Sequence, residues 1–254
     1  MRTIADPVEG EVVRLEPSDD DGITINGVAA TLENVDKADV RVDLARADRR
    51  SFVVEHVLGP LGLHGITAVD VTGTVDSWSF DRPEHRFCYS VDLGPHHVVG
   101  HPAGLPNPGI HEAIESTKPV AGDPAKRVTV SEPVRFEDDA GHLTLRPADP
   151  GDGLQFDVTF GDARKRLAVD PLEGTDTDAI AEIVTSTTPF LAPDDAEAAT
   201  HAIADLVSDI GVLGGFSDLV VEGELNDHYH SQTIGAARKA REVGAVAELS
   251  PGPD

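Results

Sequence analysis

Two short motifs, far apart in the chain, hold the side chains best suited to hydrolytic metal chemistry. Glu55 and His56 are neighbours in the run 51–63, and His201 and Asp205 stand at i and i+4 much later. Together they supply three plausible ligands for one zinc ion and a carboxylate beside it. These are the fewest groups that a hydrolytic metal site needs, because the carboxylate accepts the proton of the attacking water.

The later motif belongs to a longer pattern that predicts one face of a helix. His201, Asp205 and Asp209 fall at i, i+4 and i+8 of a helix expected over 193–213, so they share one stripe. Apolar residues flank that stripe: Ala199, Ile203, Val207 and Ile210. An imidazole and a carboxylate one turn apart can converge on one cation. The alternative is an exposed helix with ordinary charges.

The remaining histidines allow further interpretations. In the stretch Asp227-His-Tyr-His230, either His228 or His230 could donate a proton, or both could lie on the surface. The Glu55-His56 pair could likewise only cap a helix or face water. Four further histidines could form a separate metal site in a loop: His85, His96, His97 and His101. The alternative is that these four side chains are simply solvated.

The first part of the chain must position Glu55 and His56. Alternation of apolar residues predicts half-buried antiparallel strands over 22–27 and 38–44, and another strand over 66–71. Between them, helical spacing predicts a short helix over 51–63 with Ser51 as a possible N-cap. The region 81–108 is rich in Pro, Gly and His and predicts an elaborated loop.

The second part must position the later motif. A polar stretch broken by proline, 120–126, marks a boundary. Strands are expected next over 127–136, 142–146 and 154–160, then helices over 177–186, 193–213 and 229–243, with a strand over 218–222. Strands followed by helices in both parts predict an α+β fold of two similar domains, 1–122 and 123–254, packed as a layered sandwich.

The amino-acid composition limits the classes of molecule that the protein can bind. The 254 residues include 46 acidic and 20 basic ones, a formal charge of −26, which disfavours binding to nucleic acid or anionic lipid. A halophilic host explains this acidity, because molar salt screens self-repulsion. The single cysteine, Cys88, excludes an intramolecular disulfide and a cysteine-rich zinc site. No apolar run is long enough for a membrane span, and the N-terminus lacks an apolar signal core, so a cytoplasmic location is expected. We also expect a monomer.

The order of the motifs resembles that of the zinc-dependent UDP-3-O-acyl-N-acetylglucosamine deacetylases. That family has a V-E-H-L segment early, an H-x-x-x-D-x-x-x-D helix late and a histidine opening the next helix. The chain offers Val54-Glu-His-Val-Leu58, then His201 to Asp209, then His228. The likeness covers about 51–71 and most of 127–243, and three motifs in register are far more specific than any one of them.

The resemblance implies that the metal lies between the two domains, held by His56, His201 and Asp205. Zinc is the expected ion, and Fe²⁺ is possible. Glu55 would act as the general base. His228 would stabilise the oxyanion and protonate the departing amine, with Asp209 orienting it. Thr188 corresponds to a family threonine near the metal. The implied substrate is an N-acetylated sugar or sugar nucleotide.

The chain also departs from the family. Ala202 stands where the family has a lysine, and only 191–200 separates Phe190 from His201, so the insert that lines a passage for an acyl chain is absent. The sequence therefore predicts a deacetylase whose substrate lacks a long acyl chain. The alternative is a non-catalytic, metal-binding or regulatory module of the same fold, for which a closed four-ligand site would decide.

Overall fold

A computed structural model describes most of the two parts of the chain that carry the motifs, and these parts form a mixed α+β fold, as the sequence predicts. It describes residues 2–5, 12–18, 22–39, 41–51, 54–66, 68–72, 127–139, 141–169, 177–184, 186, 189, 192–212, 218–226 and 228–249. The expected loop region 81–108 and boundary 120–126 lie outside these residues.

The N-terminal part contains a five-stranded sheet. Its strands are β1 (Arg2–Ala5), β2 (Val12–Pro17), β3 (Ile23–Ile25), β4 (Val28–Ala29) and β8 (Val69–Thr72). They lie in the order β1-β2-β8-β3-β4. The β3–β8 pair is parallel, and the other three pairs are antiparallel. The last of these strands along the chain therefore lies in the middle of the sheet.

The C-terminal part repeats this arrangement. Its strands are β10 (Val134–Asp138), β11 (Gly141–Pro147), β12 (Leu154–Phe160), β13 (Ala163–Val169) and β14 (Leu219–Leu225). Their order is β10-β11-β14-β12-β13, with only the β12–β14 pair parallel. Both sheets thus share strand order and strand direction, a similarity that sequence identity between the two parts does not reveal.

Two smaller sheets flank the larger ones. One is formed by β5 (Val35–Ala38), β6 (Val42–Arg46) and β7 (Arg49–Ser51), which follow the 3-10 helix η1 (Leu32–Asn34). The other pairs β9 (Arg127–Val130) with β15 (Val246–Leu249).

The expected single strand over 38–44 is wrong, because the chain reverses there. Ala38 pairs with Val42 across the antiparallel β5–β6 ladder. Inside the turn, the backbone N–H of Asp39 donates to the carbonyl of Arg41 at 3.1 Å. Apolar alternation continues across this turn, so the sequence pattern does not reveal the reversal.

Four α-helices occur in the described residues: α1 (Glu55–Leu63), α3 (Thr177–Val184), α4 (Asp195–Gly211) and α5 (Tyr229–Glu242). All four lie within the predicted ranges. The expected N-cap of the first helix is wrong: Ser51 ends β7 and its hydroxyl donates to the carbonyl of Ile25 at 3.1 Å, while Val54 precedes the helix.

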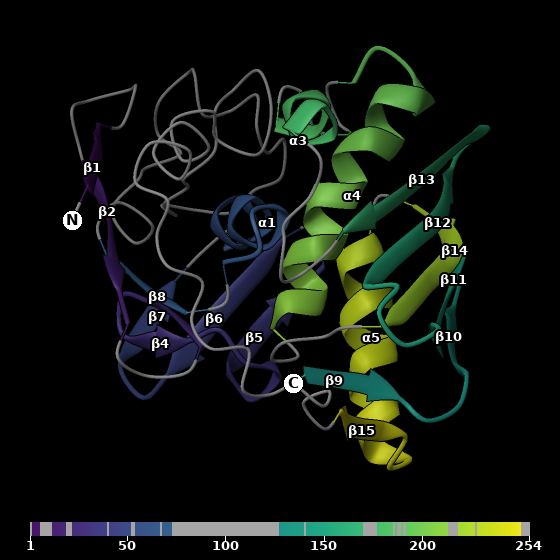
Figure 1. The fold of residues 1–254 in the computed structure, drawn as a ribbon, viewed down its shortest axis with the longest axis horizontal. Helices are drawn as coiled ribbons and strands as arrows, with labels where there is room; N and C mark the ends of the chain where they lie inside the picture. Colours follow the sequence, from purple (N-terminus) through teal and green to yellow (C-terminus); the bar gives the residue numbers. More distant parts are fainter. Residues whose placement is uncertain are drawn as a thin grey trace.

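Helices α1, α4 and α5 lie between the N-terminal strands and the C-terminal sheet (Figure 1). Helices α1 and α4 pack closely because α1 carries glycine where it meets α4. An added Cβ at Gly59 would lie 2.8 Å from the carbonyl oxygen of Ala204. Every residue of α4 from Ala198 to Ile210 is buried. This helix therefore forms the centre of the molecule.

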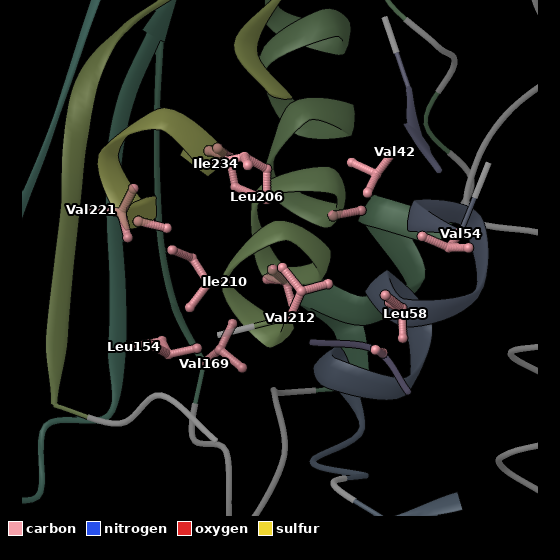
Figure 2. Packing of buried hydrophobic residues seen from close by; sticks show 14 of the residues in the cluster. Val42, Val54, Leu58, Leu154, Val169, Leu206, Ile210, Val212, Val221 and Ile234 are labelled. Carbon is pink, nitrogen blue, oxygen red and sulfur yellow. The ribbon is translucent and has the colours of Figure 1, made fainter. Parts of the chain in front are cut away.

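The apolar core runs through α4 to both sides (Figure 2). Leu206 and Ile210 of α4 lie between Leu58 of α1 and Val221 of the C-terminal sheet. Burial of such side chains contributes about 1.5–3 kcal/mol each. No helix in the described part of the chain is long and apolar enough to cross a membrane.

Candidate functional site

Five ionisable side chains are buried together where α1, α4 and α5 meet. They are Glu55 at 1% relative exposure, His201 at 1%, Asp205 at 2%, Asp209 at 0% and His230 at 3%. We call this set the buried cluster. Charged groups are rarely buried without partners, because desolvation costs several kcal/mol per ion. Their concentration on the predicted stripe of α4 and its neighbours therefore makes this region the candidate functional site.

His230 is the centre of the buried cluster. Its Nδ1 lies 2.9 and 3.1 Å from the two carboxylate oxygens of Asp209, and its Nε2 lies 3.6 Å from Oδ2 of Asp205. Burial alone would lower the pKa of His230, but the carboxylates of Asp209, Asp205 and Glu55 outweigh it and raise this pKa to about 10. In the metal-free protein these carboxylates therefore favour the imidazolium form of His230.

The two outer carboxyl groups of the cluster respond to burial in the opposite way. Burial raises the pKa of Glu55 to about 8, with His230 lowering and Asp205 raising it. Burial likewise raises the pKa of Asp209 to about 6, against the lowering effect of His230. Glu55 can thus take up or release a proton near neutral pH, which suits a general base.

A strand of the small N-terminal sheet holds Glu55 in place. One carboxylate oxygen, Oε2, accepts from the backbone N–H of Val42 at 2.9 Å. On either side of Val42, Arg41 and Asp43 form a buried ion pair at 2.7 Å. Because Glu55 is also the first residue of α1, both its backbone and its side chain are anchored.

His201 lies between a backbone carbonyl and a carboxylate. Its Nδ1 lies 3.4 Å from the backbone oxygen of Ser186, and its Nε2 lies 3.6 Å from Oδ2 of Asp205. Burial lowers the pKa of His201, so the ring is neutral. With Nδ1–H directed at the carbonyl, Nε2 presents a lone pair to a carboxylate, an arrangement that a cation would satisfy.

Asp205 has one oxygen that is left over for a further ligand. Its Oδ1 is buried and has no hydrogen-bond partner among the described residues. A neutral imidazole and a carboxylate oxygen are ligands that zinc accepts. In the part of the chain that the structure describes, no three His, Cys, Asp or Glu side chains form a complete metal-binding group.

His56 is the third metal ligand that the family resemblance implies, and the structure does not test its position. His56 follows Glu55 in the first turn of α1, and its side chain lies outside the described residues. The same holds for Thr188 and for the four loop histidines, His85, His96, His97 and His101. Their assignments stay predictions.

The structure separates His228 from the buried cluster. Its side chain is 51% exposed, and its Nδ1 lies 2.5 Å from Oδ1 of Asp39, itself 47% exposed. The expected pairing of Asp209 with His228 is therefore wrong, and Asp209 contacts His230 instead. The reason is helical phase: His228 precedes α5 as its N-cap, whereas His230 is on the side of α5 that is buried, with Ile234 and Ala237 at i+4 and i+7.

One member of the site, Tyr229, has no role in the sequence analysis. Its hydroxyl donates to Oδ2 of Asp205, and its ring lies 4.7 Å from that of His230. Burial raises the pKa of Tyr229 well above its usual value, so it stays a phenol. The sequence feature that could have identified Tyr229 as a site residue is its position next to His230, at the predicted start of a helix.

The histidine and carboxyl groups of this site come from three helices. They are side-chain types that metal-dependent hydrolases use, and the similarity goes no further than these types. A comparison of the chain with protein-family models gives no match, and neither does a comparison with curated proteins.

Proposed function

We propose that the protein is a zinc-dependent deacetylase that hydrolyses the N-acetyl group of an amino sugar or sugar nucleotide, similar to the UDP-3-O-acyl-N-acetylglucosamine deacetylases. One observation carries the proposal: the buried cluster combines a neutral histidine and a partly unpaired carboxylate on α4 with a proton-accepting Glu55 and a protonated His230. A merely structural metal site needs neither a general base nor a general acid.

The metal would be held by His56, His201 and Asp205. When bound, zinc lowers the pKa of a water towards about 7 and polarises an amide carbonyl. The contact of His201 Nδ1 with the oxygen of Ser186 supports this assignment, because metal-binding histidines usually donate their other N–H to such a group. Zinc and Fe²⁺ both accept this ligand set.

Glu55 would take the proton of the water that attacks the acetyl carbonyl. Its pKa of about 8 and its anchoring by Val42 support this role, since a base works best when its pKa is near the working pH. The N–H of Val42 fixes one oxygen, Oε2, so that the carboxylate keeps one orientation.

His230, rather than His228, would be the cation of the mechanism. It can stabilise negative charge on the carbonyl oxygen and then protonate the departing amine, which is a poor leaving group unless it is protonated. Asp209 would hold the ring in orientation through its contacts to Nδ1 and keep it charged. This assignment changes the residue implied by the family resemblance and keeps the chemistry.

The proposed architecture is two similar domains, 1–122 and 123–254, with the site between them. The shared strand order of the two five-stranded sheets supports it, as does the origin of Glu55 from one part and of the remaining cluster residues from the other. The absence of the acyl-passage insert from the sequence favours a substrate without a long acyl chain.

Metal analysis of the purified protein in high salt, joined to a fluorescence assay for freed amines over a panel of N-acetylated sugar nucleotides, tests the function. We expect about one zinc or iron per chain and release of amine from at least one compound. Glu55→Gln should keep the metal and lose about 10²- to 10⁴-fold in turnover. His201→Ala should lose the metal.

Two results would contradict the proposal. One is an absence of stoichiometric metal in the wild-type protein. The other is unchanged deacetylase activity in a metal-loaded Glu55→Gln variant, which would remove the proposed base.

A second candidate is a non-catalytic, metal-binding or regulatory module of the same fold. The position that holds a lysine in the resembling family is Ala202, which is fully buried, so no polar substrate contact can come from it. A metal site closed by a fourth protein ligand, with no activity on the panel, would favour this candidate.

A further inference from the structure

Tyr229 occupies a position that a packing role alone does not explain. It is 4% exposed, and it is the first residue of α5, directly before His230. Its ring packs edge-on against Phe160 at 6.5 Å and lies 4.7 Å from the ring of His230. A phenylalanine would make both ring contacts equally well. The hydroxyl is the part that needs an explanation.

The hydroxyl of Tyr229 donates to one specific atom, Oδ2 of Asp205. The same oxygen lies 3.6 Å from Nε2 of His230 and 3.6 Å from Nε2 of His201. Three groups on α4 and α5 thus surround Oδ2. The other oxygen of the same carboxylate, Oδ1, is buried and has no partner among the described residues.

This asymmetry defines what Tyr229 can do. A carboxylate is free to rotate about its terminal torsion, and one strong hydrogen bond to a charged acceptor restricts that rotation. The hydroxyl occupies a lone pair of Oδ2 and lies on the α5 side of the carboxylate. A cation bound beside His201 then meets a carboxylate whose orientation is already set.

We propose that Tyr229 is a positioning residue for the metal site, whose hydroxyl orients the carboxylate of Asp205 for binding a divalent cation. The inference rests on the proposed metal site. Outer partners of metal ligands typically contribute about 10- to 100-fold to metal affinity, because they remove the cost of orienting the ligand during binding.

The experiment compares zinc affinity between wild-type protein and Tyr229→Phe, by competition with a chromophoric chelator in high salt. Phenylalanine keeps the ring contacts with Phe160 and His230 and removes only the hydroxyl. We expect zinc to bind about 10- to 100-fold more weakly to the variant. The visible spectrum of the cobalt-substituted protein should also change, because the carboxylate would meet the metal in another orientation.

Thr129→Val is the matched control. Thr129 of β9 is also buried, and its hydroxyl donates to the carbonyl of Asp218 at 2.7 Å. Loss of this hydroxyl should leave zinc affinity unchanged. A general loss of stability would instead weaken both variants alike, as thermal unfolding of the metal-free proteins would show.

A measurement on the unsubstituted fold covers the case in which Tyr229→Phe does not fold. The sequence has two tyrosines, Tyr89 and Tyr229, so biosynthetic 3-fluorotyrosine gives two ¹⁹F resonances, assigned with Tyr89→Phe. Zinc titration should shift the resonance of Tyr229 with the midpoint of metal binding.

The outcomes separate this inference from the proposed function. If wild-type protein binds no divalent cation, both fail. If it binds zinc while Tyr229→Phe binds with equal affinity and an unchanged cobalt spectrum, or the ¹⁹F resonance of Tyr229 does not move, only the role of Tyr229 is overturned.

Discussion

Two histidine–carboxylate pairs lie at the start of α5. They contain the same two side-chain types and differ in how deeply these are buried. His230 and Asp209 are buried at 3% and 0%, whereas the side chains of His228 and Asp39 are about half exposed. In the interior, low dielectric strengthens the attraction between ring and carboxylate. At the surface, water and salt screen it. Two positions along the chain therefore separate a buried histidine held between carboxylates from an ordinary surface contact.

The largest expected difference between the two pairs is in catalysis. Replacement of His230 by Gln should lower kcat/KM by about 10²- to 10⁴-fold, because the site loses its only buried cation among the described cluster residues. His228→Gln should stay within roughly a factor of three, as expected for an exposed pair. Parallel amine-release assays measure both, and a larger loss in His228→Gln would reverse the assignment.

The pH dependence of stability should also distinguish the interior. The folded-state pKa of Glu55, about 8, lies above its ordinary 4.5, so the folded protein binds more protons between these values and loses stability as the pH rises through them. In metal-free protein we expect Glu55 alone to contribute a loss of about 2–4 kcal/mol between pH 5 and pH 9, to which His230 and Asp209, whose pKa values are also raised, add losses of the same sign. Denaturation curves of wild type and Glu55→Gln, recorded over this pH range, give the free energy of unfolding at each pH. An equal pH dependence of this free energy in the two proteins would contradict the prediction.

A matched pair of glycine substitutions compares interior and surface packing. Gly59→Ala should destabilise the protein by about 1–3 kcal/mol, since the new methyl would meet the carbonyl oxygen of Ala204. Gly211 ends α4 at the surface, and nothing lies within 4 Å of its added Cβ. Gly211→Ala should therefore be neutral or stabilise by about 0.4–1 kcal/mol. Urea unfolding midpoints report both values.

The smallest effect should come from breaking the surface pair itself. Asp39→Asn removes the charge opposite His228 and should change the free energy of unfolding by less than about 1 kcal/mol. The change should shrink further in molar salt, which a salt series of unfolding curves would test. A larger, salt-insensitive effect would mean that this pair is not an ordinary surface contact.

The sequence predicts the interior better than it predicts which histidine enters it. The spacing of His201, Asp205 and Asp209 is local, and helix α4 places all three in the buried cluster as the stripe requires. The choice between His228 and His230 depends on where α5 begins, and a shift of two residues changes which side chain points inward. The turn after Ala38 is local, but apolar alternation continues across it and hides it. The shared order of the two sheets depends on long-range pairing, which periodicity does not encode.

The position of the last strand in each sheet has a consequence for how the chain acquires its structure. Strands β8 and β14 are the final strands of their sheets along the sequence, yet each lies in the middle. During synthesis the earlier hairpins therefore keep unpaired edges until the last strand follows, after α1 in the N-terminal sheet and after α3 and α4 in the C-terminal sheet. Such late, long-range closure slows folding and exposes strand edges to other chains. The large negative charge of this chain opposes association during that interval.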